Sequence, residues 1–299
     1  MDVRDSLDIE TVSAALVTSG RPWRGVEFHP AVGSTNTRLR ELLTGSPPAT
    51  SAYAVSPGDD VPGPWWVVLT DHQTGGRGRL GRAWTVPDRA SLAVSVAVPV
   101  TDPAQAGWMP LLAGLALARA VTEVTEAAGH RLTSRLKWPN DVLLADDGDR
   151  KLSGILCELV ASGGRQVVVV GTGVNVDQTR DELPVETATS LALAGVRVRR
   201  EDLLVAYLDH LTAVLGGAGV TRADDTGAVG REAVRAAYRS ACVTLGLQVR
   251  VQLPAGGAAE GTAVAVDDDG GLVVRTAGGL RTFAAGDVVH VRAAAGGLA

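Results

Sequence analysis

Apolar side chains recur at helical spacing in several separate parts of this chain. In residues 7–18 they stand three to four positions apart, which is typical of one buried face of a helix. A short amphipathic stretch follows Ser34 and ends near Leu43. The remaining predicted helices cover residues 104–128, 200–215 and 231–241. Gly129 comes directly after the first of these three and predicts where that helix ends.

Other segments alternate apolar and polar residues, which predicts β-strands. The acidic turn at residues 145–150 separates two such runs and predicts a hairpin, and Gly163-Gly164 leads into a further run. The predicted strands cover residues 65–70, 91–98, 141–144, 151–156 and 166–170. We predict a polar loop at residues 177–189. Residues 44–64 hold five prolines, which predicts a mobile surface insertion.

The pattern changes after Gly246, where short alternating runs follow one another with turn residues between them. These runs cover residues 247–253, 260–266, 272–276, 280–284 and 287–292. Five short strands in about 50 residues predict a small β-barrel. We therefore predict two domains, residues 1–242 and residues 243–299.

Composition narrows the class of protein. The chain has 299 residues, of which 45% are apolar, enough for one large domain and one small domain. Its net charge of −5 argues against a protein that mainly binds nucleic acid. Cys157 and Cys242 lack the paired spacing of a disulfide framework or a zinc site, and Cys157 lies in an apolar run typical of a core. Without a long apolar run or a signal peptide, a cytoplasmic protein is expected.

The segment Gly75–Arg82 combines four glycines with three arginines, so a flexible backbone carries dense positive charge. Guanidinium groups match the oxygens of phosphates and carboxylates, so this loop can close over an anion. Its Gly-x-Gly-x-x-Gly spacing also fits a dinucleotide-binding loop, but that motif requires a helix directly after it. Here Pro87 and a second predicted strand follow instead. A solvated, arginine-rich hairpin loop is the remaining alternative.

Lysine is rare in this chain, and both lysines lie in segments whose side chains could bind a ligand or take part in a reaction. Of 28 lysines and arginines, only Lys137 and Lys151 are lysine, which suggests that these sites need a compact ammonium group, with chance placement as the alternative. Lys137–Asp141 brings together a cation, an indole and a carboxylate, although Trp138 also fits a core position. Gly171–Val176 ends a strand with two glycines, which permits either a close ligand or a β-bulge.

Five segments occur in an order and spacing that closely resemble biotin–protein ligases. They are Ser34–Asn36, Asp71–Gln73 with Gly75–Arg82, Lys137–Asp141, Lys151–Leu156 and Gly171–Val176. The resemblance covers about residues 24–292. It implies an α+β fold: a catalytic domain with a mixed β-sheet and flanking helices, related to class II aminoacyl-tRNA synthetases, followed by a small SH3-like β-barrel.

The resemblance also implies a two-step reaction. The carboxylate of biotin attacks the α-phosphate of ATP and gives biotinoyl-5′-AMP and pyrophosphate. A specific lysine on the biotin carboxyl carrier domain of a biotin-dependent carboxylase then attacks the mixed anhydride, and AMP leaves. ATP and biotin are thus the implied substrates, and Mg²⁺ accompanies ATP, held largely by the phosphates.

Matching positions imply the roles of individual residues. Lys151 and Arg79 are the implied catalytic residues, because two anions react and fixed cations reduce their repulsion. The implied biotin-binding residues are Ser34, Thr35, Asn36, Gln73, Gly75, Arg77, Gly78, Arg79 and Lys151. The implied ATP- and adenylate-binding residues are Arg77, Arg79, Arg82, Trp84, Lys137, Asn140, Asp141 and Asn175. Trp84 fits either stacking on adenine or a core position. No protein ligand of a metal is assigned.

Three other functions are the alternatives. A lipoate–protein ligase shares the fold and the adenylation chemistry, but the Gly-Arg loop together with Lys137–Asp141 favours biotin. A non-catalytic biotin-binding regulator would lack Lys151 or the loop arginines, and all are present. A nicotinamide-dependent oxidoreductase lacks its helix after the glycine loop. Some relatives carry an N-terminal DNA-binding domain; with about 24 residues before the catalytic domain, we expect none here, and no nucleic-acid or membrane partner. Monomer and weak homodimer both remain open.

Overall fold

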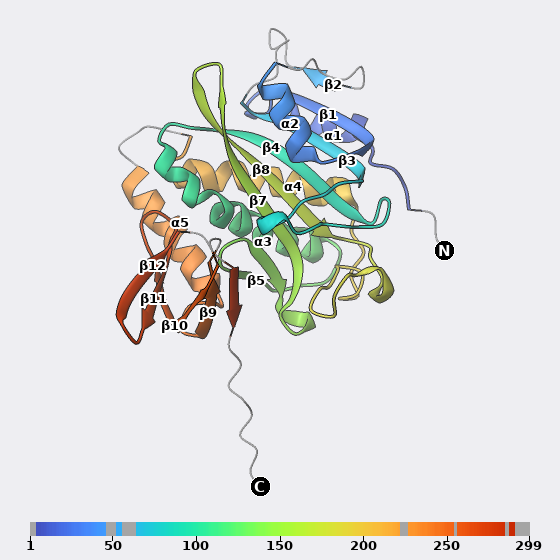
Figure 1. The fold of residues 1–299 in the computed structure, drawn as a ribbon. Coiled ribbons are helices and arrows are strands. Elements are labelled where there is room, and N and C mark those ends of the chain that lie inside the picture. The colour runs from blue at the N-terminus through green and yellow to red at the C-terminus, as the bar shows by residue number, and fades with distance from the viewer. Residues whose placement is uncertain are drawn as a thin grey trace.

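The structure is a computed structural model that describes residues 4–45, 52–55, 64–221, 227–253, 256–284 and 287–290. An eight-stranded sheet carries helices on both faces, and a five-stranded sheet follows toward the C-terminus (Figure 1). The helices are α1 (Ile9–Leu16), α2 (Thr35–Leu43), α3 (Met109–Ala127), α4 (Arg200–Gly217) and α5 (Gly227–Ala241). The strands of the larger sheet are β1 (Gly25–Val32), β2 (Ala52–Val55), β3 (Trp66–Gln73), β4 (Ser91–Val100), β5 (Ser134–Lys137), β6 (Asp141–Leu144), β7 (Arg150–Ser162) and β8 (Arg165–Asn175).

The larger sheet is mixed, as predicted, because one of its strand pairs is parallel. The strand order is β2-β1-β3-β4-β8-β7-β6-β5. Strand β1 pairs with β3 in parallel, with α2 in the connection between them, and the other neighbours are antiparallel. The predicted hairpins β6–β7 and β7–β8 are confirmed. Strands β1, β2 and β5 were not predicted. Strand β2 lies within the proline-rich segment, most of which is outside the described residues.

Alternate residues of β3 belong to two apolar clusters on opposite faces of the sheet. Trp66 and Val68 pack with Leu39 of α2 on one face. Val67 and Leu69 belong to the larger cluster, which includes α3 and α4, on the other face. Because α2 is short, it covers only part of its face and leaves the ends of β7 and β8 open for a site.

Helix α3 begins later than predicted. The segment before it, Pro103–Gly107, is a 3-10 turn, and the α-helix starts at Met109 with Pro110 in its first turn. A helix that began at residue 104 would place Pro110 in its interior, where proline removes a hydrogen bond and clashes with the preceding turn. The predicted end is confirmed, since α3 stops at Ala127 and Gly129 has a φ of 81°.

The five predicted C-terminal strands are all present as an antiparallel sheet. They are β9 (Gln248–Gln252), β10 (Ala258–Val266), β11 (Leu272–Thr276), β12 (Gly279–Phe283) and β13 (Asp287–His290), in the order β12-β11-β10-β9-β13. Within the part of the chain that the structure describes, β12 and β13 are unpaired edges, so a closed barrel is not confirmed. The division at residue 242 stays a prediction.

The turn between β10 and β11 connects the small sheet to the larger unit. Trp138 Nε1 donates to the carbonyl oxygen of Gly270 at 2.9 Å, and Trp108 Nε1 donates to that of Asp268 at 2.9 Å. The side chain of Trp138 is fully buried, so the core alternative for this residue is the one observed. The residues on either side of Trp138 are thereby held in place from the C-terminal sheet.

Candidate active site

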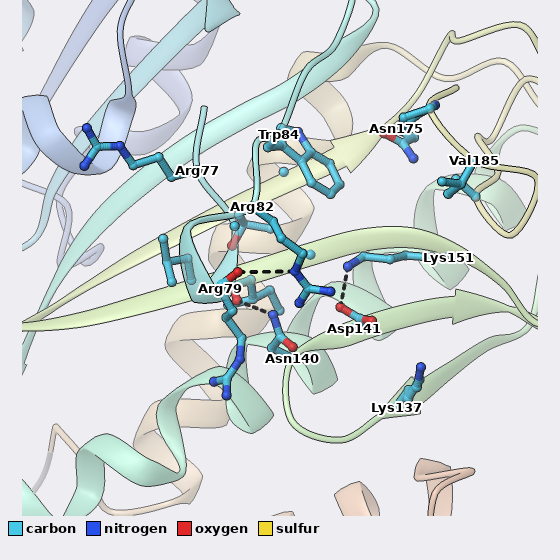
Figure 2. Close-up of a pocket in the computed structure, with 18 of the residues that line it drawn as sticks. Arg77, Arg79, Arg82, Trp84, Lys137, Asn140, Asp141, Lys151, Asn175 and Val185 are labelled. Atoms are coloured by element: carbon cyan, nitrogen blue, oxygen red, sulfur yellow. Dashed lines mark hydrogen bonds and ion pairs between the residues drawn. The ribbon is translucent and has the colours of Figure 1, made fainter. Parts of the chain in front are cut away.

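A cavity of about 1220 Å³ opens on the sheet face that α2 leaves uncovered (Figure 2). Side chains from all five sequence segments line it. The predicted site residues that line it are Ser34, Thr35, Asn36, Gln73, Arg77, Gly78, Arg79, Arg82, Trp84, Lys137, Asn140, Asp141, Lys151 and Asn175. Gly75 is the predicted residue that does not line it. Tertiary folding therefore brings segments more than 130 positions apart in sequence into one site.

Glycines on β7 and β8 make room for side chains on the cavity floor. A Cβ at Gly173 would lie 2.8 Å from the Trp84 indole, and one at Gly154 would lie 3.2 Å from it. A Cβ at Gly171 would lie only 2.0 Å from Asn36 Oδ1. Gly154 and Gly173 are paired across the two strands, so together they form a flat platform under Trp84. The alternative of a bulge at the glycines of β8 is not observed, because β8 pairs in regular register with both neighbours.

One end of the cavity is a preorganised polar cluster. Gln73 Oε1 accepts a hydrogen bond from the backbone N–H of Thr35 at 3.0 Å. Ser95 Oγ lies 2.7 Å from Thr35 Oγ1 and donates to Asn36 Oδ1 at 2.6 Å. Asn36 Nδ2 in turn donates to Glu158 Oε2 at 2.8 Å. The cluster presents fixed hydroxyl and amide groups that can both donate and accept hydrogen bonds.

Sequence reasoning missed the supporting role of Ser95. Its only signal is a serine at an otherwise apolar position of a strand that is buried on both faces. A hydroxyl group buried there needs a partner, which the two side chains at the start of α2 supply.

Lys151 forms an ion pair in the middle of the cavity. Its Nζ lies 2.6 Å from Asp141 Oδ1 and 5.7 Å from the centre of the Trp84 ring. Both partners stay partly exposed to the cavity, with 33% and 19% of their side chains accessible. Asn140 next to Asp141 is tied to β7, where its Nδ2 donates to the carbonyl oxygen of Ile155 at 2.8 Å. A cation is thus held ready for an anionic ligand.

The Gly-Arg loop is a hairpin folded beside this cation. Its arms are joined by hydrogen bonds from Gly78 N to Arg82 O at 2.7 Å and from Trp84 N to Gly76 O at 2.9 Å. The loop is followed by strand β4 rather than by an α-helix, which confirms that it is not a dinucleotide-binding loop. Figure 2 shows the side chains of Arg77 and Arg79 pointing in different directions from the loop, so they do not converge on one ligand atom.

Asn175, predicted for the site, and Cys157, predicted for the core, both have well-defined surroundings. Asn175 is buried, and both polar atoms of its amide have a partner: Nδ2 donates to Thr189 O at 2.9 Å and Oδ1 accepts from Gln178 Nε2 at 3.0 Å. Burial raises the pKa of the Cys157 thiol well above its usual range, and the nearby Arg79 only partly opposes this effect. Cys157 is half-buried and packs against the apolar core, in agreement with the core position that its apolar surroundings in the sequence predicted.

Part of the cavity wall was not predicted at all. It comes from the segment at residues 184–188 and from the C-terminal region, through Pro184, Val185, Thr187, Ala188, Val243, Leu247 and Val289. These residues are mostly apolar and carry no motif, so only the tertiary structure identifies them.

In the described part of the chain, no helix is long and apolar enough to span a membrane.

Comparisons with known proteins agree with this geometry. The Biotin/lipoate A/B protein ligase family matches residues 61–175, and the biotin protein ligase C terminal domain matches residues 244–291. A biotin–[acetyl-CoA-carboxylase] ligase of Mycobacterium tuberculosis is 37% identical over 97% of this chain and 98% of its own length. One from Paracoccus denitrificans is 30% identical over 80% of this chain and 96% of its own length.

Solved structures show the same likeness. The biotin protein ligase from Aquifex aeolicus in complex with biotin and ATP superposes with a TM-score of 0.66 and 26% identity, over 91% of this chain and all of that one. The identity to full-length relatives, the order of the motifs and their convergence on one cavity lead to one conclusion. The chain belongs to the biotin protein ligase family.

Proposed function

We propose that this protein attaches biotin to a specific lysine of a biotin carboxyl carrier domain, using ATP and forming biotinoyl-5′-AMP on the way. The observation that carries the proposal is the ammonium group of Lys151, which faces the cavity beside the polar cluster and the arginine loop. The full-length relative from Mycobacterium tuberculosis, named a biotin–[acetyl-CoA-carboxylase] ligase, supports this substrate.

In the first step, a carboxylate oxygen of biotin attacks the α-phosphorus of ATP. The bond from that phosphorus to the bridging oxygen breaks, and pyrophosphate leaves with the electron pair. Both reactants are anions and repel each other. Positive charge near the reacting oxygens lowers the barrier because it stabilises the transition state more than the bound reactants. Lys151 and Arg79 are the groups that we assign to this task.

In the second step, the neutral amine of the acceptor lysine attacks the acyl carbon. The bond from that carbon to the phosphate oxygen breaks, AMP leaves with the electron pair, and the amine loses a proton as the amide forms. The polar cluster of Thr35, Asn36 and Gln73 would hold the ureido ring of biotin, which has both N–H donors and a carbonyl acceptor. Lys137, Asn140 and Asp141 would lie on the nucleotide side.

Mg²⁺ bound to the ATP phosphates would supply further positive charge. Two carboxylates line the cavity, Asp141 and Asp149, and this fits a metal ion that is held largely by phosphates and by one or two side chains. No group of three or more acidic, histidine or cysteine side chains forms a metal site of its own in the described residues.

Finer parts of the proposal rest on the family resemblance. They are an SH3-like closure of the C-terminal sheet and the relation of the catalytic domain to class II aminoacyl-tRNA synthetases. A cytoplasmic location is a further part of the proposal. The absence of a nucleic-acid partner is likewise proposed, and it is supported by the net charge of −5.

ATP–pyrophosphate exchange with purified protein and Mg²⁺ tests the function directly. We expect exchange with biotin and none with lipoate or without an acid. Exchange with lipoate alone would reassign the chain to lipoate ligation. Folded protein that exchanges with neither acid would point to a non-catalytic biotin-binding role. Transfer of labelled biotin to a carrier domain, lost when its acceptor lysine is replaced, then tests the second step.

The glycine floor makes a further prediction. Gly171→Ala would push the new methyl group into Asn36 and disrupt its hydrogen bonds with Ser95 and Glu158. Because the loss of buried hydrogen bonds costs about 1–3 kcal/mol, we expect the KM for biotin in the exchange assay to rise roughly tenfold. Gly216→Ala is the matched control, since a Cβ there meets nothing within 4 Å. An unchanged KM for biotin in Gly171→Ala would remove Asn36 from the biotin site.

A further inference from the structure

Lys151 faces the cavity because of an irregularity in β7. In a regular strand, residues an odd number of positions apart lie on opposite faces, yet Lys151 and Gly154 share one face: a Cβ at Gly154 would lie 3.3 Å from Lys151 Nζ. The pairing with β6 explains this. Val142 pairs with Ser153 but Leu143 pairs with Lys151, so β7 has one extra residue at this point. Such a bulge re-aims the side chain next to it, here the ammonium group of the site.

A separate segment supports the bulge from the side opposite β6. Strand β8 ends at Asn175, and beyond that point residues 187–189 run alongside β7 in parallel. Lys151 N donates to Thr187 O at 2.8 Å, and Thr189 N donates to Lys151 O at 2.9 Å. Both backbone hydrogen-bonding groups of Lys151 are therefore satisfied by this segment, and its position determines where the Lys151 side chain begins.

Thr189 is held at its own position by two side chains. Its hydroxyl donates to Asp147 Oδ2 at 2.5 Å, and its carbonyl oxygen accepts from Asn175 Nδ2 at 2.9 Å. Asp147 also binds Arg150 Nη1 at 2.5 Å, and it lies 3.8 Å from Arg180 Nη2. Thr189 is fully buried, whereas the side chain of Asp147 keeps 20% of its surface exposed. The turn between β6 and β7 is thus clamped to residues 187–189.

We propose that Thr189 and Asp147 are positioning residues for Lys151. Their hydrogen bond fixes residues 187–189 against the bulge, and the bulge turns the ammonium group into the cavity. The inference rests on the proposed function only where it predicts a rate. Neither residue lines the cavity, so neither is expected to contact a substrate.

The scarcity of lysine provides a direct measurement. With protein labelled at lysine ¹³Cε, only Lys137 and Lys151 give lysine signals, and Lys137→Arg assigns them. The Lys151 signal reports its position next to the Trp84 ring and Asp141. In Thr189→Val, which removes the hydroxyl but keeps the shape, we expect this signal to move toward that of an unpaired lysine.

Catalysis should change in a matching way. Because a small misplacement of a catalytic group lowers the rate more than binding, we expect kcat of biotin-dependent exchange to fall on the order of tenfold in Thr189→Val. The KM values for biotin and ATP should stay within about twofold. Thr189→Ser, which keeps the hydroxyl group, should restore both the signal and the rate.

Two further variants separate positioning from general stability. Asp147→Ala removes the acceptor of the same hydrogen bond. Because the Asp147 side chain is partly exposed, this variant stays informative if Thr189→Val folds poorly. The kcat of the double variant should be no lower than that of the slower single variant, because both substitutions break the same hydrogen bond. Thr125→Val is the matched control: it removes another fully buried hydroxyl, in α3 and bonded to Val121 O at 2.8 Å, away from the cavity.

The outcomes are distinct. The inference is overturned if Thr189→Val and Asp147→Ala show the same Lys151 signal and the same kcat as Thr125→Val. Thr189 and Asp147 would then have a purely structural role. If the wild-type protein shows no biotin-dependent exchange, the proposed function fails, but the lysine spectra still decide whether Thr189 and Asp147 position Lys151.

Discussion

Lys151→Ala is expected to lower the rate of biotin-dependent ATP–pyrophosphate exchange by on the order of a hundredfold or more. The ammonium group sits in the cavity, 2.6 Å from Asp141, where it can reach an anionic ligand. Removing it takes away positive charge where two anions must meet, and it leaves the Asp141 carboxylate to repel them. Single-turnover formation of biotinoyl-5′-AMP measures the effect on the first step directly.

Two variants show whether charge or geometry carries the effect. Lys151→Arg keeps the charge on a larger, planar group, and we expect it to recover only part of the rate. In Asp141→Asn the ammonium loses its carboxylate partner, which tests the ion pair without removing the cation. The melting temperature of Lys151→Ala should stay close to that of the wild type, because the side chain is one-third exposed. Adenylate formation at the wild-type rate in Lys151→Ala would exclude its assigned role.

Arg79→Ala is expected to speed the release of biotinoyl-5′-AMP by roughly tenfold to a hundredfold. Arg79 lies in the Gly-Arg loop and lines the cavity. A charge-assisted hydrogen bond to a phosphate contributes about 1.5–3 kcal/mol, so its loss should mainly raise the dissociation rate. The dissociation rate is measured by forming the complex of the enzyme with labelled intermediate and then adding excess unlabelled biotin and ATP.

A neighbouring residue in the same loop supplies the control. Leu80 is 54% exposed and carries no charge, so Leu80→Ala should retain the intermediate as the wild type does. If Arg79→Ala released the intermediate no faster than Leu80→Ala, loop closure through Arg79 would be rejected. Faster release in both variants would instead assign the effect to the loop backbone, since Leu80 has a φ of 55°.

The sequence by itself determined most elements and which segments meet at the cavity. The helices and the C-terminal strands follow from local spacing of apolar residues, and that spacing reflects which face of each element is buried. Almost every residue that the motifs predicted for the site lines the cavity. Gly75 is the exception, and α3 begins later than predicted because Pro110 cannot stand inside a helix.

Only the tertiary structure decided how these residues face one another. The pairing of β6 with β7 creates the bulge that turns Lys151 into the cavity, and residues 187–189 support it from far along the chain. Apolar wall residues such as Val185 and Val289 carry no local signal that separates them from a core. Strand register and the packing of distant segments depend on contacts between residues far apart in sequence, and no local pattern contains that information.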